Sequence, residues 1–300
     1  MSAEARPQLG LGQADVEAVA HRMEEQIADV TPTRWGWTTP GSSVRFASGR
    51  QVVIQRRPAA ETARMAAAIV AFAAAGVPVP SILLRVPSGP DELIAFVHVP
   101  GEVAAARLEG PTGAILAGRM GAALEMVRSV PAVGIPLDPA WEGPAALGSA
   151  IAEWLARADL GPRLSAIATA ASEMVCAQPW APVTTHGDYV PVNMLFAGDV
   201  LSAILDLGDV ALRHPLIDPA WWSLIVGHHH PSAGPARAAF LASRGIPATD
   251  RELAAVAIVR GTQLAAGAQS AQRPGARALI EAAASAWAAS SPGSSQQPIG

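Results

Sequence analysis

The chain has 300 residues, of which 50% are hydrophobic and 15% are charged, and its formal net charge is −4 at pH 7. This composition is typical of an ordered globular protein and offers no strongly basic surface for nucleic acid. A single cysteine, Cys176, excludes an intrachain disulfide and a cysteine-based zinc site. All 21 basic residues are arginines, so any role that lysine usually takes must fall to another residue type.

The first hundred residues predict a small β-sheet that carries one main helix. Apolar residues recur at helical spacing over residues 15–30, and again over 60–75 before Gly76 and Pro78 end the pattern. The apolar run over 65–84 contains prolines that would break a membrane span. Short β-like runs, separated by turn residues, cover 33–38, 44–47, 51–57, 82–86 and 93–99.

Beyond residue 100 the composition changes to alanine-rich helical stretches. These cover roughly 112–129, 145–158, 162–177 and the chain from 219 onward, and they flank an island of short apolar runs and turns over 183–218. The first twelve residues show no signal peptide, and the tail over 291–300 reads as disordered. We therefore expect an α+β, bilobal fold, with an N-terminal lobe over 1–99 and a C-terminal lobe over 100–300.

The island contains three side chains suited to phosphoryl transfer. Asp188 and Asn193 lie on one predicted loop, and Asp206 follows an apolar strand at the end of a predicted β-hairpin. Phosphoryl transfer needs a carboxylate to orient or deprotonate the attacking hydroxyl and hard oxygen ligands for magnesium. The hairpin would bring Asn193 and Asp206 together, next to the loop that carries Asp188.

The string His-Gly-Asp-x4-Asn from His186, then a hairpin, then an apolar residue and Asp-x-x-Asp, resembles the signature of the aminoglycoside/macrolide phosphotransferase family. The resemblance extends to choline-kinase-like relatives and implies a protein-kinase-like fold with ATP or GTP as phosphoryl donor. It implies that Asp188 is the catalytic base and that Asn193 and Asp206 bind Mg²⁺. His186 is expected to shape the loop through hydrogen bonds.

Two more acidic residues are expected to support the site. Asp209 is either a metal-side or hydrogen-bonding helper or a solvated turn carboxylate. Asp218 resembles the second aspartate of the family's Asp-Pro-x-x-Asp segment, whose first position is His214 here, and this implies a structural role at a helix entrance.

The resemblance places nucleotide contacts in the N-terminal lobe. Backbone N–H groups of Gly41, Ser42 and Ser43 are expected near the phosphates, although an ordinary hairpin turn explains these residues nearly as well. Val97 and Val99, in the connector between the lobes, would meet the purine edge.

The family's phosphate-binding lysine and its partner glutamate are both replaced. Arg56 is the predicted substitute for the lysine, with Arg57 as the next candidate and Gln55 in another register. Met65 stands at the expected glutamate position, and Glu61, one turn earlier, is either an arginine partner or a solvated first-turn residue.

The acceptor side of the sequence is less specific. After Asp218 the chain has only three acidic residues against six arginines, which argues against a site for a highly cationic acceptor. The apolar residues there suit a bulkier acceptor or simple core packing: Trp221, Trp222, Ile225, Phe240 and Leu241. The run at 228–230 is expected to be a helix end and not a metal site, because consecutive helical residues diverge by about 100°.

The sequence thus predicts a cytoplasmic phosphotransferase that acts on a hydroxyl of a small molecule. The expected acceptor is an antibiotic such as a macrolide, an aminoglycoside or another natural product, in resistance or self-protection. A primary-metabolite kinase of the choline or homoserine type and a nucleotide-binding pseudokinase are the alternatives. We expect a monomer or homodimer without nucleic-acid or membrane partners.

Overall fold

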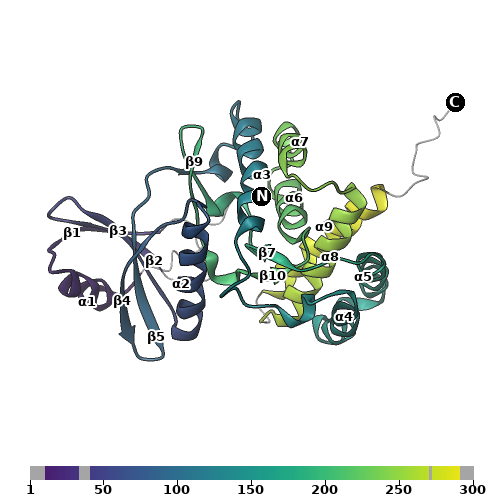
Figure 1. Cartoon of the computed structure of the whole chain (residues 1–300), viewed down its shortest axis with the longest axis horizontal. Helices are drawn as coiled ribbons and strands as arrows, with labels where there is room; N and C mark the ends of the chain where they lie inside the picture. The colour runs from purple at the N-terminus through teal and green to yellow at the C-terminus, as the bar shows by residue number, and fades with distance from the viewer. Residues whose placement is uncertain (1–10, 34–40, 270–271, 291–300) are drawn as a thin grey trace.

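The structure is a computed structural model that describes residues 11–33, 41–269 and 272–290, and it has a β-rich lobe beside a larger helical lobe (Figure 1). The predicted α+β, bilobal, protein-kinase-like fold is confirmed. The N-terminal lobe contains an antiparallel sheet in the order β1-β2-β3-β5-β4. Its strands are β1 (Ile27–Pro32), β2 (Gly41–Phe46), β3 (Gln51–Pro58), β4 (Ile82–Ser88) and β5 (Asp91–Val97).

Two helices, α1 (Gln13–Met23) and α2 (Ala59–Ala74), cover opposite faces of this sheet. Side chains of successive strand residues point to opposite faces. Accordingly Leu93 packs in the cluster with α1, whereas its neighbour Ile94 packs with α2. The same alternation along β3 decides which of its arginines faces the helical lobe.

The prediction of one helix over residues 15–30 is wrong at its end. The helix stops at Met23, because Glu24 adopts a left-handed conformation with φ 58°, and residues 27–32 form β1. This edge strand is mostly exposed, so it lacks the alternating hydrophobic pattern that marks a half-buried strand. The strand predicted over 33–38 lies mainly outside the described residues.

The helical lobe contains a three-stranded ladder, β6-β8-β9, a two-stranded ladder, β10-β7, and seven of the helices within the described residues. Its strands are β6 (Glu102–Val103), β7 (Val183–Thr185), β8 (Met194–Ala197), β9 (Val200–Ile204) and β10 (Ala211–Arg213). Its helices are α3 (Gly113–Ser129), α4 (Pro144–Ala158), α5 (Gly161–Cys176), α6 (Ile217–His229), α7 (Gly234–Ser243), α8 (Asp250–Gly267) and α9 (Arg273–Ala289).

Helix α8 is the centre of the helical lobe and contacts α4, α5, α6 and α9. A capping box of Thr249 and Glu252 fixes its start. No helix in the described part of the chain combines the length and hydropathy that a bilayer span requires.

The apolar cluster in which Ile94 packs with α2 also extends into the helical lobe and joins the two lobes. Met65 and Phe72 of α2 share this cluster with Tyr189, Phe196 and Leu207 of the helical lobe. Helix α2 also contacts the short 3-10 turn η4 (Leu207–Asp209), which follows β9. The N-terminal lobe is thereby held directly against the loops that carry the predicted catalytic residues.

Candidate active site

The loop that carries Asp188 leaves β7 at His186 and is held by buried polar contacts. The Nε2 atom of His186 donates to the carbonyl of Leu205 at 2.8 Å, and its Nδ1 accepts from the backbone N–H of Asp188 at 3.2 Å. The His186 ring is fully buried. Its position is that of a residue that shapes the loop, not one that meets a substrate.

Asp218, in the first turn of α6, holds the same loop from the other side. Its two carboxylate oxygens accept from the backbone N–H groups of His186 and Gly187 at 2.8 and 2.9 Å. Burial raises the pKa of Asp218, while the nearby His186 and these two backbone hydrogen bonds act to lower it. Gly187 has φ 86°, and a Cβ there would lie 2.4 Å from the carbonyl oxygen of Asp209, so the tight turn requires glycine.

Asp188 has a hydrogen-bond donor on each carboxylate oxygen. The Nδ2 atom of Asn193 donates to Oδ2 at 3.0 Å, and the indole Nε1 of Trp221 donates to Oδ1 at 2.9 Å. Nδ2 of Asn193 also lies 2.9 Å from the Asp188 carbonyl. Because these bonds use the amide nitrogen, they leave Oδ1 of Asn193 available to accept a hydrogen bond or to bind a cation.

The β8–β9 hairpin brings Asn193 close to Asp206, as the sequence predicts. Met194 pairs with Ile204, and the backbone N–H of Leu205 donates to the Asn193 carbonyl at 2.7 Å. Asp206 then adopts a left-handed conformation with φ 59°. Such a conformation is uncommon outside glycine and is often found at functional sites.

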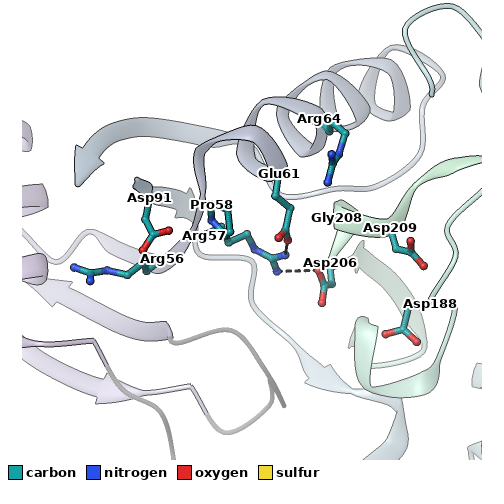
Figure 2. Close-up of a pocket in the computed structure, with 10 residues that line it drawn as sticks. All are labelled: Arg56, Arg57, Pro58, Glu61, Arg64, Asp91, Asp188, Asp206, Gly208 and Asp209. Atoms are coloured by element: carbon teal, nitrogen blue, oxygen red, sulfur yellow. Dashed lines mark hydrogen bonds and ion pairs between the residues drawn. The ribbon is translucent and has the colours of Figure 1, made fainter. Parts of the chain in front are cut away.

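Arg57 connects Asp206 to the N-terminal lobe. Its Nη2 lies 2.8 Å from Oδ1 of Asp206, and its Nη1 lies 2.5 Å from Oε1 of Glu61 (Figure 2). The Arg57 side chain is only 5% exposed. Glu61 is therefore an arginine partner, and not the solvated residue that the alternative reading proposed.

Arg56, the predicted lysine substitute, does not reach Asp206. Its guanidinium forms an ion pair with Asp15 of α1 and a hydrogen bond with Ser88, and in Figure 2 it points away from Asp188, Asp206 and Asp209. Adjacent strand residues face opposite sides of the sheet, so although both arginines line the cavity, only Arg57 is directed at Asp206. Of the two candidates, Arg57 is the one that contacts Glu61 and Asp206, and the arginine that binds phosphate stays a prediction. Met65, at the expected glutamate position, is buried in the interlobe core.

Asp209 lies between two arginines that sequence reasoning did not single out. Nη2 of Arg213 donates to its Oδ1 at 2.9 Å, and Arg260 of α8 pairs with its Oδ2. Burial alone would raise the pKa of Asp209, but Arg260 and Arg213 outweigh that effect and lower it. Arg213 is itself held by Asp138 at 2.9 Å. Asp209 thus links its loop to Arg213 and to Arg260 of α8.

A cavity of about 600 Å³ opens between the lobes at these residues. Asp188, Asp206 and Asp209 line it from the helical lobe, and Figure 2 shows Glu61 and Arg64 extending into it from α2. The remaining lining residues are Arg56, Arg57, Pro58, Asp91 and Gly208.

The cavity offers oxygen ligands of the kind that Mg²⁺ prefers. Among the described residues, no three His, Cys, Asp or Glu side chains gather into a metal-binding group. Magnesium in nucleotide sites needs only one or two protein carboxylates, because substrate phosphates and water complete its coordination. The Asp206 carboxylate and Oδ1 of Asn193 fit that requirement.

Gly41, Ser42 and Ser43, the predicted backbone contacts for phosphate, lie at the start of β2. These residues belong to β2 and pair on one side with β3, and Ser42 and Ser43 also pair with β1. The Ser42 side chain is 1% exposed. Sheet pairing thus engages the backbone of Ser42 and Ser43, and contact of these three residues with phosphate stays a prediction. Residues 34–40 lie outside the described part of the chain.

The predicted purine-binding connector follows β5. The N–H of Val97 donates to the carbonyl of Ser81 at 2.9 Å, which leaves only its carbonyl for a purine. Val99 is half-buried between β5 and β6. Their contact with a nucleotide base stays a prediction.

Most of the apolar residues assigned to the acceptor side belong to the core. Trp222 stacks on Phe240 with ring centroids 3.7 Å apart, and both side chains are fully buried. Trp221 is also buried, but its indole N–H reaches Asp188. The run at 228–230 ends α6, as expected.

Sequence reasoning missed the partners that come from distant elements: Arg213, Arg260, Asp138 and the hydrogen bond of Trp221. One signal for Arg260 was available. It is the single charged residue in a helix segment over 253–262 whose residues are all buried, and a charge in such a segment needs a buried partner.

A β-rich lobe, an interlobe cavity and this set of acidic residues define a protein-kinase-like phosphotransferase. The family profile described as "Phosphotransferase enzyme family" matches residues 29–257. The chain therefore belongs to the phosphotransferase enzyme family and is a kinase-type enzyme. A comparison with curated protein sequences gives no match.

Solved structures with the same fold include two classes of antibiotic phosphotransferase. The macrolide 2'-phosphotransferase MphH from Brachybacterium faecium is 19% identical, with a TM-score of 0.67 over 88% of this chain and 97% of that chain. Aminoglycoside phosphotransferase APH(4)-Ia is 16% identical, with a TM-score of 0.72 over 92% of this chain and 99% of that chain. A thermostable mutant of the latter, in ternary complex with ADP and hygromycin B, is 15% identical, with a TM-score of 0.64 over 90% and 97% of the two chains.

Proposed function

We propose that this enzyme transfers the γ-phosphoryl group of ATP or GTP to a hydroxyl group of an antibiotic, such as a macrolide or an aminoglycoside. The observation that carries the proposal is the convergence, in one interlobe cavity, of Asp188, Asp206 and the Arg57–Glu61 pair. The antibiotic class is supported by the similar structures, which include a macrolide and an aminoglycoside phosphotransferase.

In the proposed reaction Asp188 acts on the acceptor. Its carboxylate accepts a hydrogen bond from the acceptor hydroxyl and takes the proton as the hydroxyl oxygen bonds to the γ-phosphorus. The bond from that phosphorus to the bridging oxygen breaks, and the nucleoside diphosphate leaves with the electron pair. Both Asp188 oxygens already have one donor, and each keeps a lone pair for the hydroxyl.

Asn193 and Asp206 hold the donor side of the reaction. They would bind Mg²⁺, which neutralises phosphate charge when it is bound. Arg57 carries the charge that lysine supplies in related enzymes, and its planar guanidinium can bind a carboxylate and a phosphate at once. The alternative of a pseudokinase rests on the missing lysine and on Met65, and the Arg57–Glu61 pair at 2.5 Å supplies a substitute for both.

The proposal places the enzyme in the cytoplasm, where nucleoside triphosphates and Mg²⁺ are available. The acceptor is a small molecule, and the enzyme needs no nucleic acid or membrane to act. The half-buried thiol of Cys176 suits a reducing compartment.

The test is an acceptor panel analysed by mass spectrometry. The purified chain is incubated with Mg-ATP or Mg-GTP and with macrolides, aminoglycosides, choline and homoserine, and each acceptor is examined for the gain of one phosphoryl group. We expect a phosphorylated antibiotic. Phosphorylation of choline or homoserine alone would contradict the antibiotic assignment, and nucleotide binding without transfer to any acceptor would indicate a pseudokinase.

A further inference from the structure

The indole of Trp221 contacts Asp188 from helix α6, outside both the loop that carries Asp188 and the hairpin that leads to Asp206. Trp221 lies in the second turn of α6, is 6% exposed, and donates from Nε1 to Oδ1 of Asp188 at 2.9 Å. The two residues are 33 positions apart in the chain. The contact is therefore tertiary, and the packing of α6 determines it.

Trp221 and Asn193 together define the orientation of the Asp188 carboxylate. Asn193 donates to Oδ2 at 3.0 Å, and Trp221 donates to Oδ1. With one donor on each oxygen, rotation of the carboxylate about its Cβ–Cγ bond would break at least one hydrogen bond. The Asn193 amide belongs to the same loop as Asp188 and would move with it. Trp221 lies on α6, so its hydrogen bond fixes the carboxylate relative to the rest of the helical lobe.

The same helix also holds the backbone of the loop. Asp218, three residues before Trp221, accepts from the N–H groups of His186 and Gly187. Residues three apart lie on one helix face. The same face of α6 therefore holds the loop backbone, through Asp218, and the Asp188 carboxylate, through Trp221. Because the indole is buried, its position is set by the core and not by solvent.

We propose that Trp221 is a positioning residue for Asp188: its indole N–H holds the catalytic carboxylate in the orientation that receives the acceptor hydroxyl. This inference rests on the proposed function of Asp188. It assigns Trp221 to the turnover step, in place of the acceptor-binding or core-packing roles that the sequence suggested. Misplacing a catalytic group by about 1 Å can cost roughly 100-fold in rate without changing substrate binding.

The test compares variants that keep the shape of residue 221 but remove its N–H. Trp221→Phe keeps an aromatic ring, and site-specific replacement by the benzothiophene analogue of tryptophan, with sulfur in place of N–H, keeps the whole indole outline. The matched control is Trp222→Phe, since Nε1 of Trp222 is buried and has no hydrogen-bond partner among the described residues. Thermal unfolding of each variant verifies that it folds.

We expect kcat to fall about 10- to 100-fold in both position-221 variants, while KM for nucleotide and acceptor stays within about twofold. Trp222→Phe should keep the wild-type kcat. A benzothiophene variant with wild-type kcat would overturn the inference, as would a loss that appears in KM alone. Failure of the proposed function would show differently, as an absence of transfer by the wild-type chain itself.

Discussion

Nη2 of Arg57 lies 2.8 Å from Oδ1 of Asp206, although the two residues are 149 positions apart in the chain. One belongs to β3 of the N-terminal lobe, and the other follows β9 of the helical lobe. Glu61 accepts a hydrogen bond from the other terminal guanidinium nitrogen of Arg57, Nη1. The buried Arg57 side chain thus joins the strand, the α2 helix and the proposed metal ligand.

We expect Arg57→Ala to lower kcat/KM for the nucleotide by about 100-fold, because the variant removes the charge that we propose to face the transferred phosphate. Arg57→Lys should recover part of the loss, since a single ammonium keeps the charge but cannot bridge two carboxylates in the same planar geometry. Steady-state kinetics with the nucleotide as the varied substrate measures both.

The neighbouring arginine provides the matched control for this prediction. Arg56→Ala removes an equal charge from the opposite face of β3, where Arg56 pairs with Asp15. Arg56 also lines the cavity, but its guanidinium pairs with Asp15 and Ser88, so we expect a much smaller loss than in Arg57→Ala. A larger loss in Arg56→Ala than in Arg57→Ala would restore the assignment that the sequence alone favoured.

Gly208 makes room for the Arg57–Glu61 pair. A Cβ at residue 208 would lie 2.9 Å from Nη1 of Arg57 and 3.0 Å from Oε1 of Glu61. We expect Gly208→Ala to displace the pair and to raise KM for the nucleotide several-fold, with little change in the free energy of unfolding. Gly148→Ala, at a helical position of α4 with no atom within 4 Å of the new Cβ, is the control. The same KM for the nucleotide in Gly208→Ala and Gly148→Ala would contradict the prediction.

The stability of the helical lobe should depend on His214. Burial lowers the pKa of His214 from its ordinary value of 6.5 to about 4, while Glu252 acts weakly to raise it. Between these pH values the unfolded chain binds the proton and the folded chain does not. The free energy of unfolding should therefore decrease as pH falls from 6.5 to 4, by on the order of 3 kcal/mol from this group.

Denaturant unfolding at a series of pH values measures this contribution. His214→Asn keeps an acceptor for the N–H of Leu216 but does not titrate, so the decrease below pH 6.5 should become shallower. An identical slope in His214→Asn and wild type would show that His214 does not carry the effect.

The local part of the site was predictable from the sequence, and its tertiary part was not. Asp188, Asn193 and Asp206 lie within one loop and one hairpin, so spacing and strand pairing already place them near one another. The choice between Arg56 and Arg57 depends on which face of β3 meets the other lobe, and a one-residue shift in register reverses it.

The sequence pattern gave little indication of contacts between the site and distant helices. Trp221 carries the same apolar pattern as its buried neighbour Trp222, and only the packing of α6 directs one indole to Asp188 and the other to Phe240. Likewise β1 is an exposed edge strand, and it is a strand because its backbone pairs with β2 and not because of a hydrophobic pattern. Hydrophobic periodicity reports burial, so it could not distinguish these cases.

The central claim is that the Asp188 carboxylate receives the proton of the acceptor hydroxyl. The most direct measurement is single-turnover phosphorylation of the acceptor by wild type and by Asp188→Asn, with Mg-nucleotide affinity measured in parallel. Asp159→Asn, at the exposed end of α4, is the control because Asn tolerates the same left-handed conformation. We predict that Asp188→Asn binds the nucleotide as tightly as wild type but transfers phosphate roughly 10²- to 10⁴-fold more slowly. Transfer by Asp188→Asn at the rate of the wild type and of Asp159→Asn would contradict the assignment.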